Sequence, residues 1–273
     1  MNSYIYIYKL NSKEGKEHLY DDLISTAKFE TSFSTYILDR ESEYGKSFKI
    51  TYDQIINSIL NDFNQILPSE LLEIVNWYEQ LAFGNIFGVD TDWKKNEEIL
   101  NTMLKSSGIE LLYDFSSSST SNWAFIAQYQ NFDEHYPLDA FHEGINDGSN
   151  IKSNDFIGFL EYVILLMCKI NASGLDDFFD YSKEYSDSRL SEIERIKLTY
   201  KDDVKLHKVI NDAFEDIKTE WIEYNAREKN NSNDWFPPVA HTVHDVYCFL
   251  TASLEMIESI KEENKNIVMI HCC

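Results

Sequence analysis

Hydrophobic positions recur at helical spacing in three segments of the first part of the chain. Thr51 and Gln54 form a capping box, which predicts a helix from residue 51 to Pro68. A second helix is expected from Ser69 to Gly84, and a third over about 91–107. The apolar positions of the first two are 55, 56, 59, 60, 63, 66, 67, 71, 72, 74, 75, 77 and 78. This spacing favours amphipathic helices over strands.

Four shorter segments are dense in β-branched and aromatic residues instead. Residues 3–10 and 266–271 predict a strand at each end of the chain. Residues 109–115 and 123–129 predict two more strands, joined by the serine-rich run 116–122 into a central hairpin. Because the terminal strands can pair within one sheet, this pattern favours a single domain.

The second half of the chain returns largely to helical patterns. A strongly apolar helix is expected over 154–172, ended by a glycine at 174. Two or more polar helices are expected within 188–228, and a last helix over about 239–262. The turn-rich stretch 131–153 is expected to be irregular.

Together these elements predict an α+β fold that is predominantly helical. Its small sheet is expected to combine the N-terminal strand, the central hairpin and the C-terminal strand. We expect one domain over residues 1–273, and no repeat of 20–50 residues divides it. If a weak subdivision exists, the polar stretches 145–153 and 174–187 are where we expect it.

Charge is the strongest compositional signal: 47 Asp and Glu stand against 24 Lys and Arg, for a net charge of −23. Arginine occurs only at positions 40, 189, 195 and 227. Phosphate neutralisation relies on Lys and Arg, so direct nucleic-acid binding is disfavoured. Anionic membranes are repelled for the same reason, whereas a basic protein is attracted. Simple solubility is the alternative explanation of the acidity.

The cysteines and the ends of the chain predict a cytoplasmic location. The four cysteines show no CxxC spacing, and Cys168 lies inside the apolar helix, which suits reduced thiols. The N-terminus lacks the pattern of a signal peptide. The apolar run 156–170 is shorter than the roughly 20 residues that span a bilayer and predicts a buried helix. The terminal Cys272 and Cys273 only weakly suggest lipidation, because no nucleotide-binding loop accompanies them.

One cluster on the last predicted helix has the composition of a metal site. His241, His244 and Asp245 have the i, i+3, i+4 spacing that can bring two imidazoles and a carboxylate to one divalent transition metal. A further ligand is available at 133–135 or 142–143. Since the cluster lies opposite the predicted core stripe of its helix, an ordinary solvated face is the competing interpretation.

A second candidate interleaves carboxylates with aromatic rings just after the apolar helix. Buried aromatics supply contact energy at protein interfaces, while nearby charges set partner choice and association rate. We therefore interpret the segment as a partner-binding surface; if its rings instead face the core, it is only an amphipathic piece of the fold. Its residues are Asp176, Asp177, Phe178, Phe179, Asp180, Tyr181, Glu184 and Tyr185.

These observations leave two main hypotheses. In the first, the chain is an acidic cytoplasmic protein without a cofactor that docks onto and occludes a basic protein, either a toxin or a nucleic-acid enzyme. Bacterial immunity proteins and acidic enzyme inhibitors have this general character. In the second, it is a hydrolase that uses one divalent transition metal. The sequence has no GxSxG, GxxxxGK or GxGxxG motif, so nucleophilic and phosphate-binding chemistry lack support. A structural subunit of an assembly shares the features of the first hypothesis.

Overall fold

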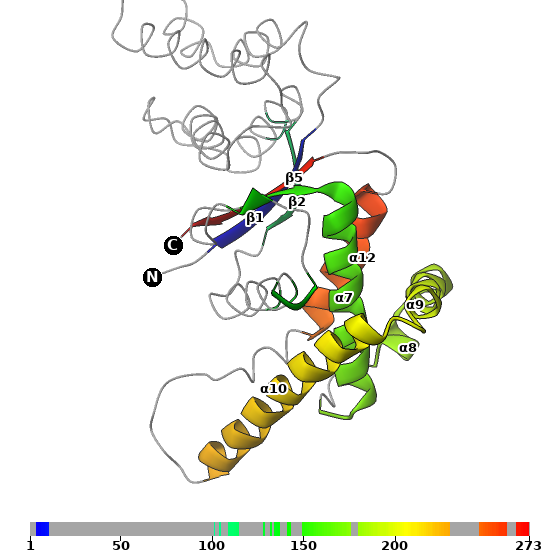
Figure 1. The fold of residues 1–273 in the computed structure, drawn as a ribbon, viewed down its shortest axis with the longest axis vertical. Helices are drawn as coiled ribbons and strands as arrows, with labels where there is room; N and C mark the ends of the chain where they lie inside the picture. The colour runs from blue at the N-terminus through cyan, green and yellow to red at the C-terminus, as the bar shows by residue number, and fades with distance from the viewer. Residues whose placement is uncertain are drawn as a thin grey trace, which may run out of the picture.

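A computed structural model shows a helix-rich α+β protein with one small antiparallel sheet (Figure 1). This confirms the fold class that the hydrophobic pattern predicts. The structure describes residues 4–10, 101, 104, 109–114, 128, 132, 134–136, 141–142, 149–175, 180–229, 246–260 and 266–272. The three helices predicted within residues 51–107 lie almost entirely outside this part of the chain; Asn101 and Leu104, which belong to the third, are helical.

The sheet has the strand order β2-β1-β5-β4-β3 and joins the two ends of the chain. The central strands β1 and β5 pair antiparallel along their whole length, from Tyr4 opposite Cys272 to Leu10 opposite Asn266. The predicted terminal strands are therefore neighbours in one sheet. The strands are β1 (Tyr4–Leu10), β2 (Ile109–Asp114), β3 (Phe141–His142), β4 (Ser149–Lys152) and β5 (Asn266–Cys272).

The hairpin of this sheet differs from the predicted one. Strand β2 pairs with β1, whereas its expected partner, 123–129, is helical at Gln128, the position that the structure describes. There the Gln128 Oε1 atom accepts a buried hydrogen bond of 2.9 Å from the Tyr162 hydroxyl. The observed hairpin is β3 with β4, from the stretch expected to be irregular. A short apolar run has no period that separates a strand from a buried helix, which explains the error.

Helix α7 (Ser153–Ala172) forms the centre of the core. It carries apolar side chains around its whole circumference, as expected for a helix surrounded by protein. It ends as predicted, because Gly174 follows with a φ of 70°, a left-handed conformation that glycine adopts without strain. Its fully buried apolar side chains are Phe156, Phe159, Leu160, Tyr162, Val163, Ile164, Leu166, Met167 and Ile170.

Helix α12 (Val246–Ile260) packs along α7 with the face that the sequence predicts. Leu250, Leu254 and Ile257 are buried, whereas Cys248 and Glu255 on the opposite side are exposed. The preceding part of the predicted helix, 239–245, lies outside the described residues.

Three further helices cover the end of α7 that lies away from the sheet (Figure 1). They are α8 (Tyr181–Glu184), α9 (Asp187–Thr199) and α10 (Val204–Lys229), and the last two confirm the polar helices predicted within 188–228. Helix α9 buries only Ile193 and Ile196. Helix α10 buries a stripe of Leu206, Val209, Ile210, Ala213, Phe214 and Ile217 along its first half.

One continuous cluster of buried side chains joins the sheet to the helices. It runs from Ile7 and Ile151 in the sheet through α7 to α9, α10 and α12. Nothing else in the structure bears on domain boundaries, so the single domain stays a prediction. Among the helices of the described residues, none combines the length and the apolar character needed to cross a membrane.

Replacement of Phe159 by Ala should lower the free energy of unfolding by about 3–5 kcal/mol, the usual cost of a large cavity in a packed core. Phe159 is fully buried and lies against the rings of Phe132, Phe156 and Tyr162, with centroid distances of 5.8, 6.0 and 6.2 Å. Urea denaturation followed by circular dichroism measures the change. Leu198→Ala is the control: its side chain is 67% exposed, so its effect should stay within about 0.5 kcal/mol. Equal effects would contradict the placement of α7 at the centre.

Candidate functional site

The described part of the predicted partner-binding segment uses its side chains within the fold. Asp180 caps α8, where its Oδ1 atom accepts hydrogen bonds from the backbone N–H and the hydroxyl of Ser182 at 3.1 and 2.5 Å. It also pairs with Lys183 at 2.7 Å. The bonds from Lys183 and Ser182 hold the pKa of Asp180 below its usual value. Glu184 is exposed on the same short helix.

The two tyrosines of this segment are half-buried and pack against the core. The Tyr181 hydroxyl accepts a hydrogen bond of 3.2 Å from Lys197 of α9. The Tyr185 hydroxyl is hydrogen-bonded to Thr251 of α12 at 2.8 Å. Both rings therefore hold α8 against neighbouring helices. Asp176, Asp177, Phe178 and Phe179 lie outside the described residues, so the surface as a whole stays a prediction.

The predicted metal ligands His241, His244 and Asp245 also lie outside the described residues. Of the further ligands considered, Glu134 and His135 are helical and His142 belongs to β3. Within the described ranges, no group of three or more His, Cys, Asp or Glu side chains is arranged to hold a metal ion. The metal site and the hydrolase hypothesis stay predictions.

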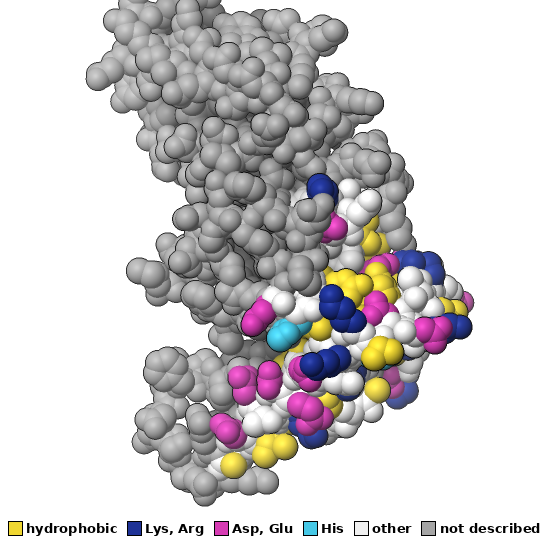
Figure 2. All heavy atoms as spheres, in the orientation of Figure 1, with side chains coloured by type: hydrophobic (Ala, Val, Ile, Leu, Met, Phe, Trp, Pro, Cys, Tyr) yellow, Lys and Arg dark blue, Asp and Glu magenta, His cyan; other side chains and the backbone are white. Residues whose placement is uncertain are grey.

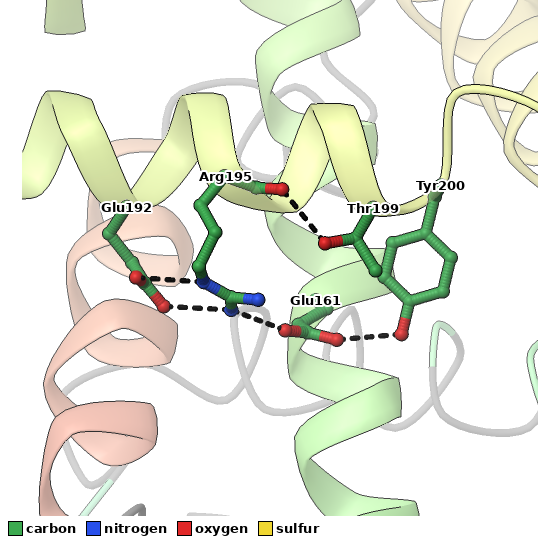
Figure 3. A network of polar contacts seen from close by, with 5 residues as sticks. All are labelled: Glu161, Glu192, Arg195, Thr199 and Tyr200. Carbon is green, nitrogen blue, oxygen red and sulfur yellow. Dashed lines mark hydrogen bonds and ion pairs between the residues drawn. The ribbon is translucent and has the colours of Figure 1, made fainter.

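A buried carboxylate lies where α9 crosses α7, and Figure 3 shows its partners. The Glu161 side chain is 9% exposed; one oxygen accepts from Arg195 at 2.7 Å and the other from Tyr200 at 2.6 Å. Arg195 also bonds Glu192 at 2.9 Å. Burial and the bond to Glu161 raise the pKa of Tyr200. Since both oxygens of Glu161 are engaged, this carboxylate joins helices and is poorly placed to act as a general base.

The most unusual charged surface of the described chain lies on α10. Asp212, Asp216, Glu220 and Glu223 fall within an arc of about 80° at 100° per residue, so they share one face. All four are exposed. Figure 2 shows Asp and Glu side chains on the visible side of α10. We call these four residues the acidic row of α10.

The carboxylates of the acidic row repel one another. Partial desolvation beside the buried stripe raises the pKa of Glu220, and the charges of Asp216 and Glu223 raise it further. On the same helix, Lys218 pairs with Glu215 at 2.8 Å, outside the row. The first turn of α10, where the helix dipole favours anions, has no acidic residue. Neither the helix dipole nor the pair of Lys218 with Glu215 accounts for the position of the row.

Sequence reasoning did not single out this row, although its signal is printed in the chain as D-x3-D-x3-E-x2-E. The spacing identifies an exposed row only once the buried face of the helix is known, and the sequence predicted these residues merely as part of a polar helix. Comparisons of the chain with protein-family models, with curated proteins and with solved structures give no significant match.

Glu220→Gln should raise the free energy of unfolding by about 0.5 kcal/mol at neutral pH, because two like-charge contacts are removed from one helix face. The raised pKa of Glu220 means that the native protein binds the proton more tightly than the unfolded chain. The wild type therefore gains stability as the pH falls through the native pKa. The advantage of the variant should disappear below pH 4.5, the ordinary value for this carboxyl.

Urea denaturation of both proteins between pH 4 and pH 7 measures this difference. Glu215→Gln is the matched control, since it removes a carboxylate from the same helix together with its ion pair to Lys218. This control should not raise stability at pH 7. An equal gain in both variants would show that general charge reduction, rather than repulsion within the acidic row, is responsible.

Proposed function

We propose that the chain is an acidic cytoplasmic binding protein that docks onto a basic protein and occludes it, in the manner of an immunity protein or an inhibitor of a nucleic-acid enzyme. The observation that carries the proposal is the acidic row of α10. Its members are exposed and lie on one face, and after desolvation the charges of Asp216 and Glu223 raise the pKa of Glu220 further, so like charges repel one another there. The free protein already carries the unfavourable energy of this repulsion. A cationic partner relieves the repulsion when it binds, which favours the complex.

The overall charge supports the same partner class. At −23 the chain attracts a basic protein over a distance set by the ionic strength and so accelerates its association. Helix α10 also carries Ile222, which is 57% exposed and offers apolar contact on a part of the helix surface outside the row. Steering by charge followed by burial of such a side chain is a general route to a specific complex.

The row also suits a helical or extended partner more than a compact cationic patch. Residues four apart on a helix lie about 6 Å apart along its axis, so Asp212, Asp216 and Glu220 form a line about 12 Å long. Lysine or arginine side chains repeating along a partner helix match such a line. Matching charge spacing on the two helices fixes their relative position in the complex and also contributes to affinity.

The test begins with the capture of basic proteins from a lysate of the source organism at low salt, followed by titration of the purified partner against variants of the full chain. The triple variant Asp212→Asn, Asp216→Asn and Glu220→Gln should bind roughly tenfold more weakly, mainly through slower association, and its affinity should depend less on salt. Calorimetry and stopped-flow association measure both effects.

Two other triple variants make this test specific. Neutralisation of Asp187, Asp202 and Glu258 removes the same charge from exposed sites elsewhere and should weaken binding much less. Neutralisation of Asp176, Asp177 and Asp180 examines the surface predicted from sequence. If the α10 variant and the control variant bind alike, the acidic row is not the docking site. If no basic protein distinguishes the wild type from any variant, the proposed function is wrong.

A further inference from the structure

Residues 180–200, which contain α8 and α9, form a strap across α7 and α12; we call them the α8–α9 strap. Figure 3 shows α9 passing over both helices. The strap has few fully buried residues: α8 buries none, and α9 buries only Ile193 and Ile196 of its 13 residues. Its three tyrosines, Tyr181, Tyr185 and Tyr200, pack half-buried against the core. Leu198, the next apolar residue of α9, is 67% exposed. Hydrophobic burial therefore attaches the strap much less firmly than it attaches α7 to α12.

Ion pairs supply much of the remaining attachment. Arg195 bonds Glu161 of α7 at 2.7 Å, and Arg189 bonds Glu255 of α12 at 2.8 Å. The pair to Glu255 is open to water, since its side chains are 34% and 48% exposed. Salt weakens such pairs. Two of the four arginines of this acidic chain are thus used to tie the strap to carboxylates on the two core helices.

The strap covers a cysteine of α7. The Cys168 thiol is 5% exposed, and its neighbours Tyr181 and Lys197 both belong to the strap. Burial raises the pKa of this thiol to about 11, which suppresses the thiolate that reacts with electrophiles. Cys168 can therefore react at an appreciable rate only after the strap has moved, and its reactivity reports that movement.

The chain turns sharply at both sides of the strap. Gly174, with its φ of 70°, ends α7 shortly before it. After it, the turn from Tyr200 to Asp203 leads into α10, and Asp203 caps that helix by accepting from the Leu206 N–H at 2.9 Å. The start of α10 is also joined to the end of the strap, since the Tyr200 carbonyl accepts from the Asp203 N–H at 3.0 Å and lies 2.9 Å from the His207 Nε2 atom. Movement of the strap gives up the bonds of Arg195 and Tyr200 to Glu161 and those of the Tyr200 carbonyl, whereas the Asp203 cap and the packing of α7 against α10 and α12 remain.

We propose that the α8–α9 strap opens as a unit from α7 and α12 while the rest of the protein stays folded, that rising ionic strength favours the opening, and that the opening uncovers the Cys168 side of α7. Cooperative units of low stability commonly open below the global unfolding free energy. The inference concerns the free protein and is independent of the proposed partner.

Thiol labelling of the full chain under native conditions tests the proposal. Peptide mass spectrometry separates Cys168 from Cys248, Cys272 and Cys273, and division by the labelling rate of the denatured chain gives the opening constant. We expect an opening constant larger than that of global unfolding measured in urea. Between about 0.1 M and about 1 M NaCl it should rise about fivefold. Global unfolding should not become easier, because salt also screens the repulsion within a chain of −23.

Variants at one ion pair distinguish the strap from the core. Arg189→Gln should accelerate Cys168 labelling about threefold without a matching change in global stability, since the pair that it removes is exposed. Exchange of the charges, Arg189→Glu with Glu255→Arg, should restore slow labelling. Lys218→Gln removes a comparable pair on α10 and should leave the labelling of Cys168 unchanged.

The proposal fails if Cys168 reacts only at the rate of global unfolding at both salt concentrations. It also fails if Arg189→Gln and Lys218→Gln label Cys168 alike. A rate that exceeds global unfolding but falls with salt would equally overturn it, because ion pairs would then not be the attachment that yields.

Discussion

Burial of α7 on all sides is the constraint on which the rest of the described structure depends. A helix that is apolar around its whole circumference has no face for water, so other elements must cover each side. Helix α12 packs along it, α9 and α10 cover its other end, and the sheet joins the same cluster through Ile7 and Ile151. Remote parts of the sequence, including both terminal strands, are thereby held in one cluster.

One buried charge of α7, that of Glu161, fixes the position of a neighbouring helix. Glu161 is the one acidic side chain that is buried among the described residues, and an unpaired charge there carries a large desolvation penalty. Its two oxygens accept hydrogen bonds from Arg195 of α9 and from Tyr200, which directly follows α9. The pairing fixes where α9 crosses α7, although only two isoleucines of α9 are buried.

The acidic chain uses its positive and its negative side chains in different places. Its few arginines are found, where the structure describes their side chains, in ion pairs between helices: Arg189 reaches α12 and Arg195 reaches α7. The guanidinium group suits this task, because it stays charged and matches a carboxylate geometrically. On α10, by contrast, the four carboxylates of the acidic row are exposed on one face, and two of them add to the raised pKa of Glu220. Ion pairs between helices thus take up the described arginines, and most of the described carboxylates remain on the surface.

Much of the fold follows from local patterns in the sequence. The terminal strands, the polar helices and the core side of α12 were predictable, because burial imposes a period of two or of 3.6 residues on each. The apolar helix was predictable from the length of its apolar run and from its glycine end. The hairpin was not predictable: the apolar run 123–129 has no clear period, and its described position, Gln128, is helical and hydrogen-bonded to Tyr162 of α7.

The candidate surfaces show the same limit. The sequence determined the charge of −23 and the aromatic character of the segment after α7. It did not determine that Tyr181 and Tyr185 hold α8 against Lys197 and Thr251. Nor did it show that the carboxylates of α10 would form an exposed row. Periodicity records which face of an element is buried, whereas the partners of a polar side chain are set by residues far away in the chain, and only the tertiary structure brings those together.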